Sequence, residues 1–148
     1  MRTIFFDMDG TIANLYDVEN WLDDLINLNP RPYQKAKTMA NMVWLARRLH
    51  TLQSLGYKIG IISWLSKNST AEYDEQVTSA KLKWLKKHLP SISFDEIYIV
   101  PYGTPKSNFA TEKDILFDDE LKNRLDFIGA AFNPNEILQV LKELALMQ

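Results

Sequence analysis

The most informative segment of the sequence lies near its beginning and reads Thr3-Ile4-Phe5-Phe6-Asp7-Met8-Asp9-Gly10-Thr11. Its β-branched and aromatic residues favour a covered, pleated backbone, so residues 3–7 predict a buried β-strand. The strand ends at two aspartates, and Gly10 then permits a sharp turn. In open α/β sheets, ligands bind at the carboxyl ends of the strands. We therefore predict a ligand site at the point where this strand delivers its carboxylates.

Apolar runs later in the chain predict four more strands, at 57–63, 96–100, 113–117 and 126–131. Apolar residues spaced by three and four predict helices over 34–55 and 71–89, and further helices are expected from Glu120 and from Asn133. Strands that alternate with helices indicate right-handed crossovers and a parallel sheet with both faces covered. The length of 148 residues fits one α/β domain, 1–148.

Composition removes several classes of function. The chain contains no cysteine, which excludes disulfides, thiolate metal sites and cysteine nucleophiles. Its formal net charge of −2 predicts no general binding to nucleic acid or to acidic membranes. No apolar run approaches the roughly 18 residues of a membrane span, and no signal-peptide pattern opens the chain. We therefore expect a cytoplasmic protein.

The motif Asp7-Met8-Asp9-Gly10-Thr11 resembles the first motif of the haloacid dehalogenase superfamily, in the form typical of its phosphatases and phosphotransferases. Three further signals follow in the superfamily's order: Ser63 ends the second strand, Lys106 lies in the segment 103–107, and Asp118-Asp119 ends the fourth strand. The resemblance spans residues 3 to about 130. It implies a three-layer Rossmann-like fold with strand order 5-4-1-2-3, in which Asp7, Ser63 and Asp118 converge.

The resemblance also implies a role for each matching residue. Asp7 is the expected nucleophile, and Asp9 is the expected general acid and base. Ser63 and Lys106 are expected to bind the phosphoryl group. Mg²⁺ is the expected cofactor, because it binds through one or two carboxylates together with substrate oxygens. Its expected ligands are carboxylates of Asp7 and Asp118 and the backbone carbonyl of Asp9, with Asp119 as an alternative or outer ligand.

The continuation Ile12-Ala13-Asn14 makes the first motif similar to the 5'(3')-deoxyribonucleotidase branch, which implies a nucleotide substrate. The next residues, Leu15-Tyr16, depart from the acidic and aromatic pair that is usual there. Residues 11–33 predict a small, partly helical flap over the site. Trp64 and Tyr16 are candidates to contact the leaving group, and packing in the core is the alternative for both.

Several alternatives remain open from the sequence. A flap this small would leave the site exposed to water, unless the flap or a partner subunit in a homo-oligomer covers it. An open site would also accept a larger substrate, such as a phosphorylated nucleic-acid end or a phosphorylated protein. A non-catalytic phosphate-binding module on the same fold is a further alternative. The cations of residues 81–88, which are Lys81, Lys83, Lys86, Lys87 and His88, predict a solvated helix face.

Overall fold

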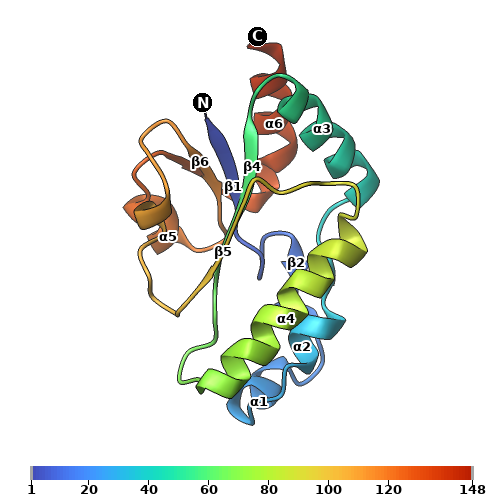
Figure 1. Ribbon diagram of the computed structural model, residues 1–148, viewed down its shortest axis with the longest axis vertical. Coiled ribbons are helices and arrows are strands. Elements are labelled where there is room, and N and C mark those ends of the chain that lie inside the picture. Colours follow the sequence, from blue (N-terminus) through green and yellow to red (C-terminus); the bar gives the residue numbers. More distant parts are fainter. Residues whose placement is uncertain (1, 148) are drawn as a thin grey trace.

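The computed structural model describes residues 2–147, and a five-stranded parallel sheet lies at its centre (Figure 1). Its strands are β1 (Thr3–Phe6), β4 (Lys58–Trp64), β5 (Glu96–Val100), β6 (Ile115–Phe117) and β7 (Ala130–Phe132). They are arranged in the order β5-β4-β1-β6-β7, and every neighbouring pair is parallel. The expected α/β class with a parallel sheet is confirmed.

The expected strand numbering, 5-4-1-2-3, differs from the observed one because the chain forms two additional short strands. β2 (Ala13–Asn14) and β3 (Lys37–Thr38) pair antiparallel in a small sheet of their own. In the main sheet, β1 lies at the centre with β4 on one side and β6 on the other. The residues that directly follow β1, β4 and β6 are therefore neighbours at one edge.

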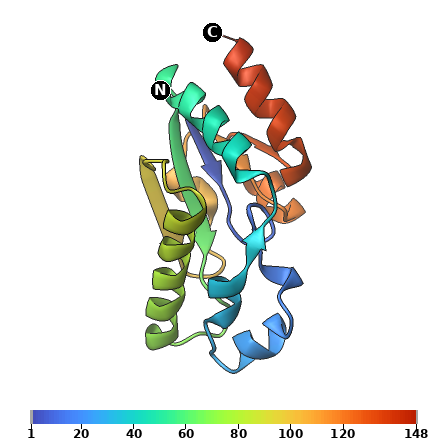
Figure 2. The ribbon, with the colours of Figure 1, turned by 90° about the vertical axis from the view of Figure 1, so that its right-hand side faces the viewer.

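The helices are α1 (Trp21–Ile26), α2 (Arg31–Lys35), α3 (Met42–Ser54), α4 (Ala71–His88), α5 (Leu121–Asp126) and α6 (Ile137–Leu146). Short 3₁₀ helices occur at η1 (Leu15–Asp17), η2 (Lys106–Phe109) and η3 (Pro134–Glu136). α3 packs against α6 on one face of the sheet, as Figure 2 shows. Within residues 2–147, no helix has the length and apolar character needed to cross a membrane.

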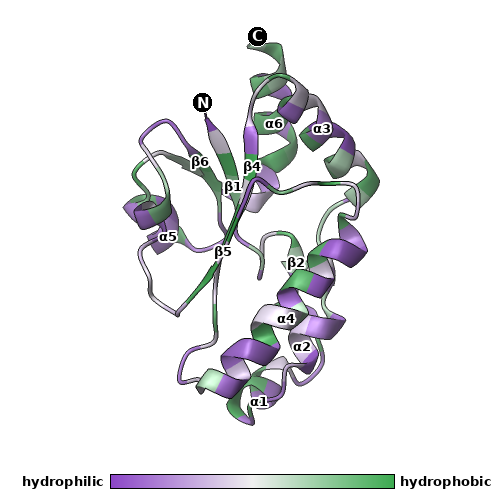
Figure 3. Ribbon diagram, viewed as in Figure 1, coloured by the Kyte–Doolittle hydropathy of each residue, from purple (hydrophilic) through white to green (hydrophobic). Residues whose placement is uncertain are grey.

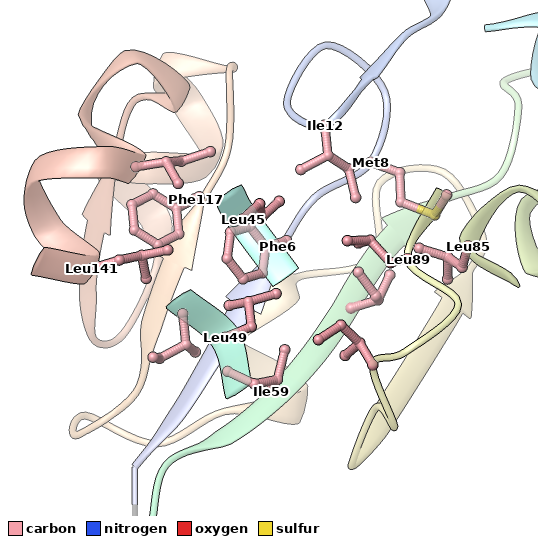
Figure 4. Packing of buried hydrophobic residues seen from close by; sticks show 14 of the residues in the cluster. Phe6, Met8, Ile12, Leu45, Leu49, Ile59, Leu85, Leu89, Phe117 and Leu141 are labelled. Atoms are coloured by element: carbon pink, nitrogen blue, oxygen red, sulfur yellow. The ribbon is translucent and has the colours of Figure 1, made fainter. Parts of the chain in front are cut away.

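The three central strands, β1, β4 and β6, are buried on both faces, whereas the edge strands β5 and β7 are only partly buried. Alternate residues of a strand point to opposite sides of the sheet. Ile4 and Phe6 of β1 pack into the larger core with α3 and α6, where Figure 4 shows Phe6 beside Leu45 and Leu49 of α3. Phe5 points the other way, into a smaller cluster. Partly buried residues of η2 and the residue after it, Phe109 and Ala110, cover this second face, together with Phe127 after α5. The two faces are therefore covered unequally.

The predicted helix over 34–55 is wrong in its first third. α2 ends at Lys35, the chain becomes extended in β3, and α3 begins only at Met42. Two hydrogen bonds explain the break: the Met39 amide donates to the Ile12 carbonyl, and the Asn41 side chain accepts from the Trp44 amide as an N-cap. Met39, an apolar residue inside the predicted helix, is 44 % exposed.

The flap is correspondingly longer than the predicted segment 11–33, because it continues through α2 to β3. Figures 1 and 2 show α1, α2 and the first turns of α4 beyond the end of the sheet where β1 and β4 finish. α4 packs against α2 through a second apolar cluster, which includes Tyr33, Tyr73 and Val77. Figure 3 shows hydrophilic and hydrophobic residues alternating along α4, as a helix with one covered side requires. This helix thus ties the flap to the sheet.

Gly60 in β4 is required by close packing against the central strand. A Cβ atom there would lie 2.7 Å from Cδ1 and Cε1 of Phe5 and 3.1 Å from the Glu96 carbonyl oxygen. Overpacking of this kind costs about 1–3 kcal/mol. We predict that Gly60→Ala lowers the free energy of unfolding by about 2 kcal/mol in urea titrations, and an unchanged unfolding midpoint would contradict this packing.

Candidate active site

Three carboxylates gather at the carboxyl edge of the central strands. Asp7 directly follows β1, and Asp118 and Asp119 directly follow the neighbouring strand β6. One oxygen from each of the three lies within 4.8 Å of the others. The Asp7 amide donates to the Phe117 carbonyl at 2.9 Å, which continues the pairing of β1 and β6 into the site. The sheet itself therefore sets the spacing of the acidic cluster.

Lys106 supplies the positive charge in this cluster. Its Nζ donates to Asp7 Oδ1 at 2.9 Å and to Asp118 Oδ2 at 2.6 Å. All three residues are buried. Burial alone would lower the pKa of Lys106, but Asp7 and Asp118 together more than offset it, and the pKa lies above its usual value. Lys106 is therefore a charged ammonium that bridges the ends of two strands.

One ammonium does not neutralise three carboxylates, and burial together with the repulsion from Asp7 raises the pKa of Asp118 and of Asp119. Burial and the neighbouring Asp7 raise the pKa of Asp118, although Lys106 opposes the rise. Burial, and then Asp7, raise the pKa of Asp119 to about 8. A hard divalent cation with oxygen ligands would relieve this repulsion, and Mg²⁺ prefers such ligands. The donor set formed by the three aspartates therefore fits a magnesium ion.

Neighbouring polar groups hold the carboxylates in place. Thr11 Oγ1 donates to Asp7 Oδ2 at 3.0 Å, and Asn123 Nδ2 donates to Asp118 Oδ2 at 3.1 Å. The Glu120 amide donates to Asp118 Oδ1 at 2.9 Å. Sequence analysis singled out neither Thr11 nor Asn123. Asn123 lies in α5, five residues after Asp118.

The backbone conformation at residue 10 and the side chains around it require a glycine there. Its φ of +81° lies in the left-handed region, which favours glycine. A Cβ atom at this position would collide with the Asp119 carboxylate and would lie 3.0 Å from the Tyr16 ring. The loop after β1 can therefore lie this close to Asp119 only with glycine at position 10.

A second buried lysine, Lys81 of α4, lies beside Asp9 and Ser63. Its Nζ donates to Asp9 Oδ2 at 3.0 Å, to Ser63 Oγ at 2.6 Å and to the Trp64 carbonyl oxygen at 2.7 Å. The side chain of Lys81 is 1 % exposed. Its predicted place on a solvated helix face is therefore wrong. The overlooked signal is its position four residues after Val77 and four before Leu85, within the buried stripe of α4.

A cavity of about 340 Å³ opens beside these groups, between the sheet edge and the flap. Asp7, Asp9, Lys106, Asp118 and Asp119 all line it. The expected phosphate ligand Ser63 does not line it, because Ser63 is fully buried and its hydroxyl accepts from Lys81. The structure thus brings five of the six predicted polar residues to one cavity and sets Ser63 behind it.

Aromatic side chains form the remaining walls of this cavity. Trp64 and Tyr16, the two candidates for contact with a leaving group, both line it. The Trp64 ring packs against Tyr102 with centroids 5.0 Å apart, and its Nε1 donates to the Thr104 carbonyl at 2.8 Å. Tyr16 meets the edge of Trp21 at 4.9 Å and is half-exposed. The cavity therefore has aromatic walls, and the Trp64 ring in one of them is held in place by its contacts with Tyr102 and Thr104.

Comparisons with known proteins bear on the fold. No family model matches the chain, and no curated protein matches it. Among solved structures, the chain is similar to the D,D-heptose 1,7-bisphosphate phosphatase from Burkholderia thailandensis, with a TM-score of 0.50 and 13 % sequence identity. The similarity covers 98 % of this chain and 74 % of the other. At this identity the similarity establishes the shared fold, and the chemistry must be argued from the residues of the site.

The raised pKa of Asp119 predicts how stability depends on pH. Folding raises this pKa from about 4 to about 8, so the folded protein retains a proton that the unfolded chain releases. The resulting stabilisation is complete below about pH 4 and is lost as the pH rises through about 8. In a metal chelator, we predict that the Tm of Asp119→Asn rises relative to that of the wild type across this pH range.

The same Tm measurement with added Mg²⁺ in place of the chelator is the control. The added Mg²⁺ should raise the Tm of the wild type at pH 8 more than that of Asp119→Asn, because the cation offsets charge that the variant lacks. Parallel Tm curves for the two proteins, with and without Mg²⁺, would contradict the proposed charge excess.

Proposed function

We propose that this chain is a Mg²⁺-dependent phosphomonoester hydrolase that acts through an aspartyl-phosphate on Asp7, with nucleotides as substrates. The observation that carries the proposal is the buried ammonium of Lys106 between the carboxylates of Asp7 and Asp118, at the wall of a cavity. The resemblance to haloacid dehalogenase phosphatases and the shared fold with a bisphosphate phosphatase support it.

Asp7 is suited to nucleophilic attack by its position at the end of the central strand. In the first half-reaction, an Asp7 carboxylate oxygen forms a bond to phosphorus while the bond to the leaving oxygen breaks. Asp9 gives its proton to that oxygen, so an alcohol departs. In the second half-reaction, water attacks phosphorus, its proton passes to Asp9, and the bond to Asp7 breaks. Inorganic phosphate leaves and both aspartates are restored.

Lys106 is placed to stabilise the charge of the transferring group. It lines the cavity and already contacts the nucleophile, so its ammonium lies beside the position that phosphoryl oxygens must occupy during attack. The same contact holds the Asp7 carboxylate in one orientation, while Thr11 holds its other oxygen. Fixed geometry of this kind lowers the entropic part of the barrier.

The carboxylates of Asp7, Asp118 and Asp119, with the backbone carbonyl of Asp9, are the proposed ligands of Mg²⁺. When bound, the cation supplies positive charge that offsets the repulsion between the nucleophile and the phosphoryl oxygens. The raised pKa values of Asp118 and Asp119 support this assignment, because burial and the neighbouring Asp7 disfavour the charged form of both groups, and a bound cation would favour it.

The aromatic walls of the cavity support a nucleotide as the substrate. A nucleobase can stack on an aromatic face, and base–aromatic stacking contributes about 1–3 kcal/mol. Trp64 and Tyr102 form one wall, with the Lys67 ammonium 5.9 Å from the centroid of the Tyr102 ring. Tyr16 and Trp21 of the flap form the other. The phosphate would then lie at the aspartates, and the base would lie between these rings.

The nucleophile assignment predicts the effect of Asp7→Asn. We expect turnover to fall by at least about 1,000-fold, because the amide cannot attack phosphorus, while the circular dichroism spectrum stays that of the wild type. The exposed Asp17→Asn is the matched control and should retain full activity. Phosphate release by Asp7→Asn at the wild-type rate would contradict the assignment.

The stacking assignment predicts a substrate-dependent effect of Trp64→Ala. We expect KM to rise about 5–150-fold for nucleoside monophosphates, the equivalent of 1–3 kcal/mol, and to change little for glycerol phosphate. Trp64→Phe should keep most of the affinity, because it preserves an aromatic face. Equal changes in KM for both substrates would remove the evidence for a base site, and activity confined to phosphorylated oligonucleotides or proteins would favour the larger substrate.

A further inference from the structure

The ammonium of Lys81 is fully coordinated in a place where an apolar side chain would be expected. A lysine ammonium has three N–H groups, and here each finds one acceptor, from Asp9, Ser63 and the Trp64 carbonyl. The Tyr33 ring lies 5.2 Å from Nζ and adds an aromatic face. None of the three protons remains for a substrate oxygen. Lys81 therefore acts on the site through the residues that it holds.

Burying the ammonium of Lys81 costs free energy unless a negative charge pairs with it. The carboxylate that pairs with it indicates the role of Lys81. Removing an ammonium from water costs several kcal/mol, whereas Val77 and Trp84, which flank Lys81 on the same stripe of α4, are buried without charge. Among residues 2–147, Asp9 is the one carboxylate within ion-pair distance of Lys81. Asp9 lines the cavity, whereas the ammonium lies behind it. The helix thus fixes a single acid at the wall of the site.

We propose that Lys81 is the positioning residue for proton transfer by Asp9, an inference that rests on the proposed function. The ion pair engages Oδ2 of Asp9, and we assign the transferred proton to Oδ1. The attraction is strongest when Asp9 is ionised, which is its state once the proton has passed to the leaving oxygen. Lys81 therefore stabilises the developing carboxylate while keeping all of its own protons.

Ser63 takes a corresponding role in this arrangement. Its hydroxyl accepts from the ammonium at 2.6 Å, and the side chain is fully buried. We assign Ser63 to the support of Lys81, together with the Trp64 carbonyl, in place of direct contact with phosphate. Two strand-end residues of β4 therefore fix a lysine of α4, and the lysine fixes the acid that follows β1.

Leaving groups of different basicity test this role. p-Nitrophenolate departs without a proton, whereas an alkoxide needs one, so only alkyl phosphates depend on a well-placed Asp9. For Lys81→Met we expect kcat to fall about 100–10,000-fold on a nucleoside monophosphate, the range of general acid catalysis, and less than about 10-fold on p-nitrophenyl phosphate. Ser63→Ala should show the same selectivity in weaker form. Inhibition by inorganic phosphate should be unchanged in both variants.

The absence of cysteine from the chain provides a rescue experiment. Lys81→Cys, alkylated with 2-bromoethylamine in denaturant and refolded, carries an ammonium on a side chain of nearly the length of lysine. Alkylation with iodoacetamide gives a neutral matched control, and the exposed Lys86→Met controls for loss of a charge elsewhere on α4. The aminoethylated protein should recover activity on the nucleotide, and the neutral one should not.

The outcomes separate the positioning role from the proposed function. Equal losses on both substrates, or equal rescue by the charged and neutral adducts, would overturn the role of Lys81 while the hydrolase assignment stands. Weaker inhibition by phosphate in Ser63→Ala would return Ser63 to the phosphate site. If Lys81→Met fails to fold, the two adducts, which share one backbone and differ in charge, decide the question. If the wild type hydrolyses neither substrate, the proposed function itself fails.

Discussion

The ammonium of Lys106 lies between the carboxylates of Asp7 and Asp118 and holds together the acidic edge of the sheet. The pairing of β1 with β6 forces these two acids together in a buried place, where they repel each other. A buried carboxylate that loses its partner costs about 3–5 kcal/mol, so the ammonium of Lys106 stabilises this edge of the sheet. The segment η2, which carries Lys106, also packs through Phe109 against the smaller apolar cluster on the second face of the sheet, and so links the site to the core.

Two lysines divide the aspartates of the site into groups with different tasks. Lys106 holds the acids that we assign to phosphorus and metal, and its one charge leaves the group negative enough to favour a cation. Lys81 holds Asp9 alone, on the side of the cavity nearer the flap. Both ammonium groups come from segments outside the strands, so the sheet positions the carboxylates and the connections between strands position the cations that pair with them. α4 has a double task, because it also anchors the flap that carries the aromatic wall.

Sequence patterns could predict most of the sheet and its acidic edge. Strands with continuous apolar runs, such as residues 3–7 and 57–63, can be recognised from the sequence alone, and each strand places the polar residue at its end, Asp7 or Ser63. The start of α3 could not be read this way, because Asn41 and a contact with Ile12 interrupt an apolar pattern that continues through the break. Lys81 was missed for a related reason: a long side chain that reaches inward and one that reaches outward look alike in sequence. Its position in the buried stripe of α4 indicates the inward direction, and the contacts of its Nζ atom with partners 72 and 18 residues away establish it.

The most direct measurement is the detection of the covalent intermediate. The wild-type protein would be mixed with Mg²⁺ and a phosphomonoester that it turns over, quenched in acid and digested, and its peptides analysed by mass spectrometry. We predict the added mass of one phosphoryl group on the peptide that contains Asp7, and removal of that mass by hydroxylamine. Turnover of the substrate with the phosphoryl group on another peptide, or with no adduct at any quench time, would contradict it.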